Sequence, residues 1–308
     1  MNARNRSGDS GNFADSEIGA PGDAREPADI AAFFDLDGTL LSLPSLETRF
    51  FRSLRHRRVI RLGNYLRWLA EAARLFPRGL KQIWHANKMY LHGVSISEAA
   101  SSFPRLPDAP RTFVKPRPGE RHGRKHIPEM PPSFYPEALA RFAWHAKHGH
   151  ALVIVSGTLQ PLAMSVAAAL EEWLVSIGSG AAIGVYATRL EARGSRWTGG
   201  IAGEAMFGEA KALAVKQIAE SRRFDLAKCF AYGDSANDRA MLEAVGRPAA
   251  VNPSNDLARI ANRQGWPILR WGPGSRGGAN SSCAPEDQSM QTSRERLRMT
   301  RSKSGIRP

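Results

Sequence analysis

Short apolar runs alternate with longer segments of helical periodicity over most of the chain. Five runs have the length and composition of buried strands: 30–34, 151–155, 182–188, 228–232 and 248–251. Apolar residues at helical spacing predict helices over 136–149, 159–174, 208–221 and from the fourth strand to 245. Strands that alternate with helices predict an α/β fold, a Rossmann-like parallel sheet with helices on both faces.

A different pattern lies between the first two predicted strands. From 49 to 92, apolar residues recur at helical spacing among basic residues, with a break at Pro77. The apolar residues with this spacing are Phe50, Leu54, Leu62, Tyr65, Leu66, Leu69, Ala73 and Phe76. One interpretation is a helical segment that packs this stripe on the core and turns a basic face to solvent. Further along, 188–203 predicts a β-hairpin that turns at Gly194 and Ser195.

These patterns divide the chain into a core, an inserted helical cap and polar ends. In chain order we expect a disordered leader at 1–28, core at 29–47, the cap at 48–133, core again at 134–271 and a disordered basic tail at 272–308. Within the cap, 104–133 contains eight prolines and is expected to be irregular. An insertion and a local shift of reading frame both explain this Pro-rich stretch.

Composition excludes several protein classes. Only two cysteines, Cys229 and Cys283, occur among the 308 residues, which argues against a disulfide-stapled scaffold and a cysteine-rich zinc module. The sequence has no run of 18 apolar residues of the kind that spans a membrane. Its first thirty residues lack the apolar segment of a secretory signal, so we expect a cytoplasmic protein.

Charge is distributed unevenly along the chain. The 43 Lys and Arg residues outnumber the 29 Asp and Glu residues and give a net charge of +14. Eleven basic residues and one acidic residue lie in 48–92, and both 104–133 and the tail are also basic. One explanation is an ordinary solvated helix face, and another is a surface that contacts an anionic bilayer at the inner face of the membrane. A nucleic-acid partner is not expected, because no nucleic-acid-binding module is recognisable.

Three polar clusters follow predicted strands directly. They are Asp35-Leu36-Asp37-Gly38-Thr39, Ser156-Gly157-Thr158 and Gly233-Asp234-Ser235-Ala236-Asn237-Asp238. Ligands of open α/β sheets bind beyond the carboxyl ends of the strands, so the three loops would share one rim. Lys211 lies between the second and third clusters in the sequence, at the start of a predicted helix.

The rim would carry the four carboxylates of Asp35, Asp37, Asp234 and Asp238. These would repel one another, and a hard divalent cation would relieve that repulsion. Ligands that offer only oxygen suit Mg²⁺. Lys211 and Ser156 can neutralise and hydrogen-bond a phosphoryl group. A carboxylate can also attack phosphorus as a nucleophile, while a second one two residues along handles a proton. A plain turn with helix capping would explain the first cluster alone.

Together, the clusters resemble the four motifs of the haloacid dehalogenase superfamily of hydrolases. The cap resembles that of the phosphoserine-phosphatase-like branch, subfamily IB. The resemblance implies that Asp35 is the nucleophile and Asp37 the general acid and base. It also implies phosphate binding by Ser156, Gly157 and Lys211. The implied Mg²⁺ site consists of Asp35, Asp37 through its backbone carbonyl, Asp234 and Asp238.

The sequence departs from phosphoserine phosphatases at one position. Those enzymes carry an acidic residue about nine positions after the nucleophile, which binds the ammonium group of the substrate. Pro44 occupies that position here, and Glu47 is out of register. We therefore expect a Mg²⁺-dependent phosphomonoester hydrolase that forms an aspartyl-phosphate and acts on a small or lipid-linked phosphate. The alternatives are a phosphatidylglycerophosphate-type phosphatase at the membrane surface and a basic nucleic-acid- or membrane-binding protein with a degenerate hydrolase core. The sequence leaves the oligomeric state open.

Overall fold

The structure is a computed structural model that describes residues 29–103 and 134–272. The predicted leader, the Pro-rich stretch and the predicted tail, apart from Gly272, lie outside the described residues. Within the described residues, no helix has both the length and the apolar character that crossing a membrane requires.

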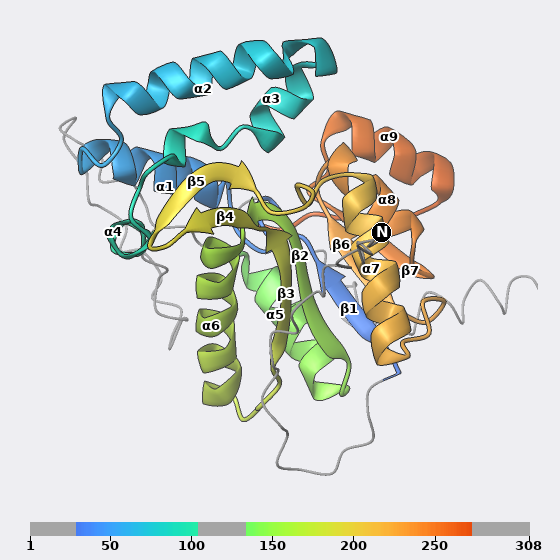
Figure 1. Cartoon of the computed structure of the whole chain (residues 1–308). Helices are drawn as coiled ribbons and strands as arrows, with labels where there is room; N and C mark the ends of the chain where they lie inside the picture. Colours follow the sequence, from blue (N-terminus) through green and yellow to red (C-terminus); the bar gives the residue numbers. More distant parts are fainter. Residues whose placement is uncertain (1–28, 104–133, 273–308) are drawn as a thin grey trace, which may run out of the picture.

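A six-stranded parallel sheet forms the centre of the molecule (Figure 1), in the order β3-β2-β1-β6-β7-β8. Its strands are β1 Ala31–Phe34, β2 Ala151–Leu159, β3 Ile183–Thr188, β6 Phe230–Gly233, β7 Arg247–Val251 and β8 Ile268–Leu269. Every pair of neighbours is parallel, which confirms the predicted fold class. The edge strand β8 was not predicted, because two residues are too few to form an apolar run.

Helices cover both faces of the sheet. One face packs against α5 Pro136–Lys147 and α6 Gln160–Ser176; the other packs against α7 Glu209–Arg222, α8 Arg239–Glu243 and α9 Asn255–Gln264. Alternate residues of β1 serve the two layers, since Ala32 and Phe34 contact the first and Ala31 and Phe33 the second. A strand with two covered faces has no polar face, which is why β1 is an uninterrupted apolar run.

The cap lies over one end of the sheet, in the upper part of Figure 1. Its helices are α1 Leu46–His56, α2 Leu62–Leu75, α3 Leu80–Ala86 and α4 Ile96–Ala100, with short 3₁₀ turns at Phe76–Arg78 and Met89–Leu91. The predicted break at Pro77 is confirmed. The hairpin of β4 Leu190–Arg193 and β5 Arg196–Ile201, also as predicted, joins the cap to the core through backbone bonds between Trp197 and Gly93 and Val94.

The predicted apolar stripe of the cap is buried on α1 but not on α2. Phe50 and Leu54 of α1 are fully buried, whereas Leu62, Leu66 and Leu69 of α2 face solvent. The interpretation of one stripe packed on the core is therefore wrong for α2. The inner face of that helix packs Tyr65 and Trp68 against the core and is also held by two polar bonds. Asn64 Nδ2 donates to the carbonyl oxygen of His92 (2.7 Å), and Asn87 Nδ2 donates to that of Trp68 (2.9 Å).

Candidate active site

The three predicted clusters do meet at one edge of the sheet. They follow β1, lie in the last part of β2 and follow β6, and these three strands are direct neighbours in the order β2-β1-β6. We call the set formed by 35–39, 156–158, 233–238 and Lys211 the rim. Because neighbouring parallel strands end side by side, residues up to 200 positions apart in the sequence share this edge.

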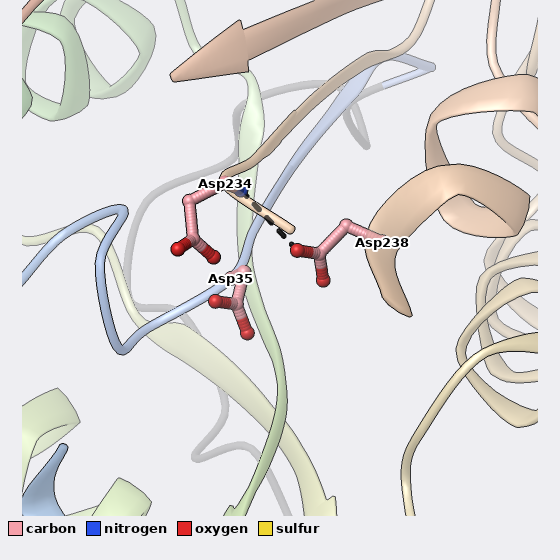
Figure 2. Close-up of side chains that lie close together, drawn as sticks. All are labelled: Asp35, Asp234 and Asp238. Carbon is pink, nitrogen blue, oxygen red and sulfur yellow. Dashed lines mark hydrogen bonds between the residues drawn. The ribbon is translucent and has the colours of Figure 1, made fainter. Parts of the chain in front are cut away.

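Three of the four predicted carboxylates converge on the rim (Figure 2). Asp35, Asp234 and Asp238 each offer an oxygen within 4.8 Å of the others. The Asp37 carboxylate is not part of this group, since its Oδ1 accepts a bond from the Leu46 amide (2.8 Å) and its Oδ2 one from Thr158 Oγ1 (2.5 Å). Three of the four predicted carboxylates thus form the tight group, while Asp37 lies beside it and its charge still helps to raise the pKa of Asp35.

Lys211 lies between two of these carboxylates. Its Nζ donates to Asp35 Oδ1 (2.6 Å) and to Asp238 Oδ1 (2.5 Å), and the side chain is almost fully buried. Burial alone would lower the pKa of Lys211, but the charges of Asp238 and Asp35 outweigh burial and raise it. The other oxygen of Asp238 accepts from the amides of Asp234 and Ser235 and from Ser235 Oγ, so this carboxylate is held firmly.

The rim carries more negative charge than Lys211 neutralises. Burial, followed by repulsion from Asp238, raises the pKa of Asp35 to about 7 despite the opposing pull of Lys211. Burial and then the charge of Asp35 raise the pKa of Asp234 to about 8. Such a site gains from a further cation, and an all-oxygen, anionic donor set suits Mg²⁺. The residues therefore fit the ion that the sequence predicts.

Two glycines allow the rim to close. Gly38 has φ +88°, and a Cβ there would lie 2.3 Å from Asp234 Oδ2. A Cβ on Gly157 would lie 2.1 Å from the ring of Phe207. Any larger residue at either position would displace a side chain of the site, so the close packing there requires glycine.

A cavity of about 690 Å³ lies between the rim and the cap. The predicted phosphate-binding residues Ser156, Gly157 and Lys211 line its floor together with Asp35, Asp37 and Asp234. Its upper wall combines the aromatic rings of Phe51, Tyr65, Trp68, His85 and Phe207 with polar side chains, among them Glu47 and Lys88. The rings of His85 and Phe207 are in contact, with centroids 3.8 Å apart, so the cap and the core meet there. Among the described residues of the cap, no arginine lines the cavity.

A family model described as haloacid dehalogenase-like hydrolase matches residues 32–243. The chain belongs to this family. In this haloacid dehalogenase-like hydrolase, the matched region contains the entire rim and the described part of the cap.

Individual relatives agree with this assignment. A probable phosphatase of Mycobacterium tuberculosis is 35% identical over 138 residues, 45% of this chain and 44% of the relative. The phosphoserine phosphatase SerB1 of the same organism is 28% identical over 260 residues, 81% of this chain and 74% of the relative. The first curated relatives are matched over less than half of their own length. A solved structure of a protein of unknown function from Bordetella pertussis Tohama I is similar with a TM-score of 0.54 and 27% identity, covering 79% of this chain and 98% of that one.

Sequence reasoning missed a second polar cluster, on the cap side of the cavity. Lys88 Nζ donates to both carboxylate oxygens of Glu47 (2.6 and 2.8 Å), and the hydroxyl of Tyr90 donates to Oε1 (2.8 Å). Lys88 is 2% exposed, and all three residues line the cavity. Glu47, out of register in the sequence, thus does reach the site. No local pattern connects it to a lysine 41 residues away.

Thr158 was also missed as a functional residue, although it belongs to the second cluster. Its hydroxyl is the side-chain partner of Asp37, and its amide donates to Ser156 Oγ (3.2 Å). The sequence signal was its place beside Ser156 and Gly157. Its role becomes visible only when β1 and β2 lie side by side.

Proposed function

We propose that the protein is a Mg²⁺-dependent phosphatase that hydrolyses phosphomonoesters through an aspartyl-phosphate on Asp35. The observation that carries this proposal is the arrangement of Lys211 between Asp35 and Asp238, with Asp234 beside them on the cavity floor. A carboxylate held by a buried lysine on the floor of a cavity is suited to attack an anionic phosphorus centre. The phosphatase names of two relatives support the same chemistry.

In the first step, the oxygen of Asp35 that does not bond Lys211 attacks the phosphorus atom. The new bond between Asp35 and phosphorus forms as the ester bond between phosphorus and the leaving oxygen breaks. Asp37 gives its proton to that oxygen, and burial raises the pKa of Asp37 in the direction that this role requires. Lys211, Ser156 and the backbone of Gly157 bind the phosphoryl oxygens.

In the second step, Asp37 takes a proton from water, which attacks phosphorus and releases phosphate and the Asp35 carboxylate. Mg²⁺, held by Asp35, Asp234 and Asp238 with the backbone carbonyl of Asp37, would neutralise the charge of the phosphoryl group. The protein itself supplies the buried positive charge of Lys211 and a site shielded by the cap.

The cavity also bears on the leaving group of the substrate. The carboxylate of Glu47 is already bonded to Lys88, so it does not offer the uncompensated charge that an ammonium group needs. The aromatic upper wall favours a leaving group with apolar surface. A lipid-linked phosphomonoester, hydrolysed at the inner face of the membrane, is therefore the second candidate beside a small soluble one.

Phosphate release by the purified protein tests the function. The substrates are p-nitrophenyl phosphate, phosphoserine, sugar phosphates, nucleotides and phosphatidylglycerophosphate, each with Mg²⁺ and with EDTA. Asp35→Asn should lose all detectable turnover, because a neutral amide does not attack phosphorus. The matched control is Asp256→Asn, which makes the same change on the exposed side of α9 and should retain full activity. Undiminished turnover by Asp35→Asn, or in EDTA, would contradict the proposal.

A further inference from the structure

The outward side of α2 is an exposed apolar surface. Leu62, Leu66 and Leu69 are 75%, 59% and 58% exposed, and their spacing places them on one side of the helix. Ala70 and Ala73 on the same side are exposed too, and Phe76 extends the surface beyond the end of the helix. We call Leu62, Leu66, Leu69, Ala70, Ala73 and Phe76 the outer face of α2. Scattered exposed leucines are ordinary, but a continuous row along one helix indicates an interaction site.

The opposite side of α2 is committed to the cap and the cavity. Asn64 and Leu75 are buried, and Tyr65 and Trp68 line the cavity. Rotating the helix to bury its leucines would break the bond between Asn64 and the His92 carbonyl and the bond between Asn87 and the Trp68 carbonyl. In Figure 1, α2 lies at the top of the cap, on the side away from the sheet. The outer face is therefore fixed in its exposed position.

Positively charged residues lie on α2 and just before it in the sequence. Arg67 and Arg74 lie on α2, and four exposed arginines precede the helix: Arg55, Arg57, Arg58 and Arg61. Residues 49–103 of the cap, all described by the structure, contain two acidic residues, Glu71 and Glu98. Glu71 is paired with Arg74. An apolar strip bordered by arginines complements a partner that is both apolar and anionic.

We propose that the outer face of α2 docks on the surface of an anionic lipid bilayer. The helix would lie in the plane of the membrane, with its leucines at the boundary of the acyl chains and the arginines against the headgroup phosphates. A second copy of this chain fits less well, because a symmetric contact through α2 would bring two rows of arginines together. This proposal does not depend on the phosphatase activity, since docking involves residues outside the rim.

Docking would also fix the orientation of the active site. One side of α2 is the outer face, and the other forms part of the upper wall of the cavity. The cavity would therefore lie one helix diameter, roughly 10 Å, from the bilayer. Tyr65 and Trp68 on the cavity side and Leu66 and Leu69 on the outer face come from the same two turns. A membrane contact would thus be communicated to the aromatic wall of the cavity by a single rigid element.

Co-sedimentation of the full chain with vesicles tests the docking surface. The vesicles are pure phosphatidylcholine or phosphatidylcholine with phosphatidylglycerol, at low and high salt and without any phosphatase substrate. The wild type should bind the anionic vesicles, ignore the neutral ones and lose binding as salt shortens the Debye length from ~10 Å at 0.1 M to ~3 Å at 1 M.

Two variants divide the surface into its components. Leu62→Ser, Leu66→Ser and Leu69→Ser together remove the apolar row and should weaken vesicle binding at least ~10-fold, since each leucine loses apolar burial. Arg55→Glu, Arg58→Glu and Arg61→Glu together should weaken it ~100-fold or more at ~1 kcal/mol per basic side chain. The matched apolar control is Met164→Ser, Val175→Ser and Leu213→Ser, and the matched charge control is Lys147→Glu, Arg222→Glu and Arg263→Glu. Both controls change exposed residues of the core and should bind like the wild type.

Each remaining outcome overturns the proposal. If the wild type ignores anionic vesicles at low salt, there is no membrane contact. If the leucine variant binds vesicles as tightly as the wild type, the contact is purely electrostatic and α2 is not its site. If the leucines instead hold together a dimer, seen by light scattering and abolished by the leucine variant, the outer face is an interface between copies. Thermal melting of every variant, with Leu→Ala replacing Leu→Ser where needed, separates lost binding from lost folding.

Discussion

The ion pairs on the rim and on α2 lie in opposite environments. On the rim, Lys211 approaches Asp238 to 2.5 Å and both side chains are almost fully buried. On α2, Arg74 approaches Glu71 to the same distance of 2.5 Å, yet its side chain is 62% exposed. Water and salt screen the exposed pair, whereas the buried pair interacts through a medium of low dielectric constant. Equal distances therefore imply different contributions to stability and function.

Apolar residues show the same contrast. Leu54 of α1 is buried in the core, and Leu66 of α2 faces solvent although it continues the same sequence pattern. Buried groups hold the fold and position the chemistry, while the exposed arginines and leucines of the cap are available to a partner. The exposed arginines of the cap thus lie on its surface, whereas the positive charges that line the cavity include Lys88 of the cap and Lys211 of the core.

The largest expected effect is on the buried pair. Lys211→Met should lower the free energy of unfolding without Mg²⁺ by about 3–5 kcal/mol at neutral pH, because two buried carboxylates lose their counter-charge. Asp35 already has a pKa raised to about 7, and loss of Lys211 would raise it further. A carboxyl with a raised folded-state pKa destabilises the fold as it ionises, so the part of the loss that comes from Asp35 should grow as pH rises above about 7. Arg74→Met, the exposed counterpart, should leave urea denaturation unchanged; an equal loss in both variants would contradict the comparison.

The second largest effect is the difference in unfolding free energy between alanine variants of Leu54 and Leu66. Leu54→Ala leaves a cavity in the core and should cost about 2–5 kcal/mol of unfolding free energy. Leu66→Ala removes the same atoms from an exposed position and should change it by less than about 0.5 kcal/mol. Urea denaturation of both variants measures the difference. A large loss for Leu66→Ala would mean that the outer face of α2 is covered within the chain.

Gly38→Ala should weaken Mg²⁺ binding by roughly 10–100-fold, the usual cost of disturbing residues that support metal ligands. Its Cβ would lie 2.3 Å from Asp234 Oδ2 and displace that carboxylate. Gly178→Ala is the matched control, because Gly178 has a similar φ of +83° but open space around it. The control should lose some stability and keep its Mg²⁺ dependence. Titration of phosphatase activity with Mg²⁺ distinguishes the two, and identical curves would remove Gly38 from the support of the site.

The smallest effect concerns the hydrogen bond to Asp37. The Thr158 hydroxyl lowers the pKa of Asp37 against the larger, opposing effect of burial. Thr158→Val should therefore raise that pKa. A general acid acts while it is protonated, so the alkaline limb of the kcat profile should move to higher pH. Thr198→Val in β5, far from Asp37, should leave the profile in place, and a shift to lower pH in Thr158→Val would contradict the assigned role.

Most of the sheet could be predicted from the sequence because strand and helix periods are local properties. Five of the six strands and the helices over 136–149, 159–174 and 208–221 appear close to their predicted bounds. The helix α9 escaped prediction, although Ser254 caps it by accepting from the Leu257 amide. Its apolar residues Leu257, Ile260 and Ala261 have helical spacing but are few, and only Leu257 and Ala261 are buried, so the pattern is short and was missed. The order of the strands in the sheet could not be predicted from local patterns, because strand pairing depends on contacts between distant segments.

The sequence by itself determined which polar residues end the strands, and hence that Asp35, Ser156, Asp234 and Asp238 share one site. That inference needs only the direction of each strand, which the alternation of strands and helices implies. Only the tertiary structure decided that Asp37 turns away to Thr158, that Glu47 pairs with Lys88, and that the leucines of α2 face outward. In each case the outcome depends on which distant segment packs against the residue. Side-chain partners and burial are properties of the assembled chain, and a pattern along the sequence does not contain them.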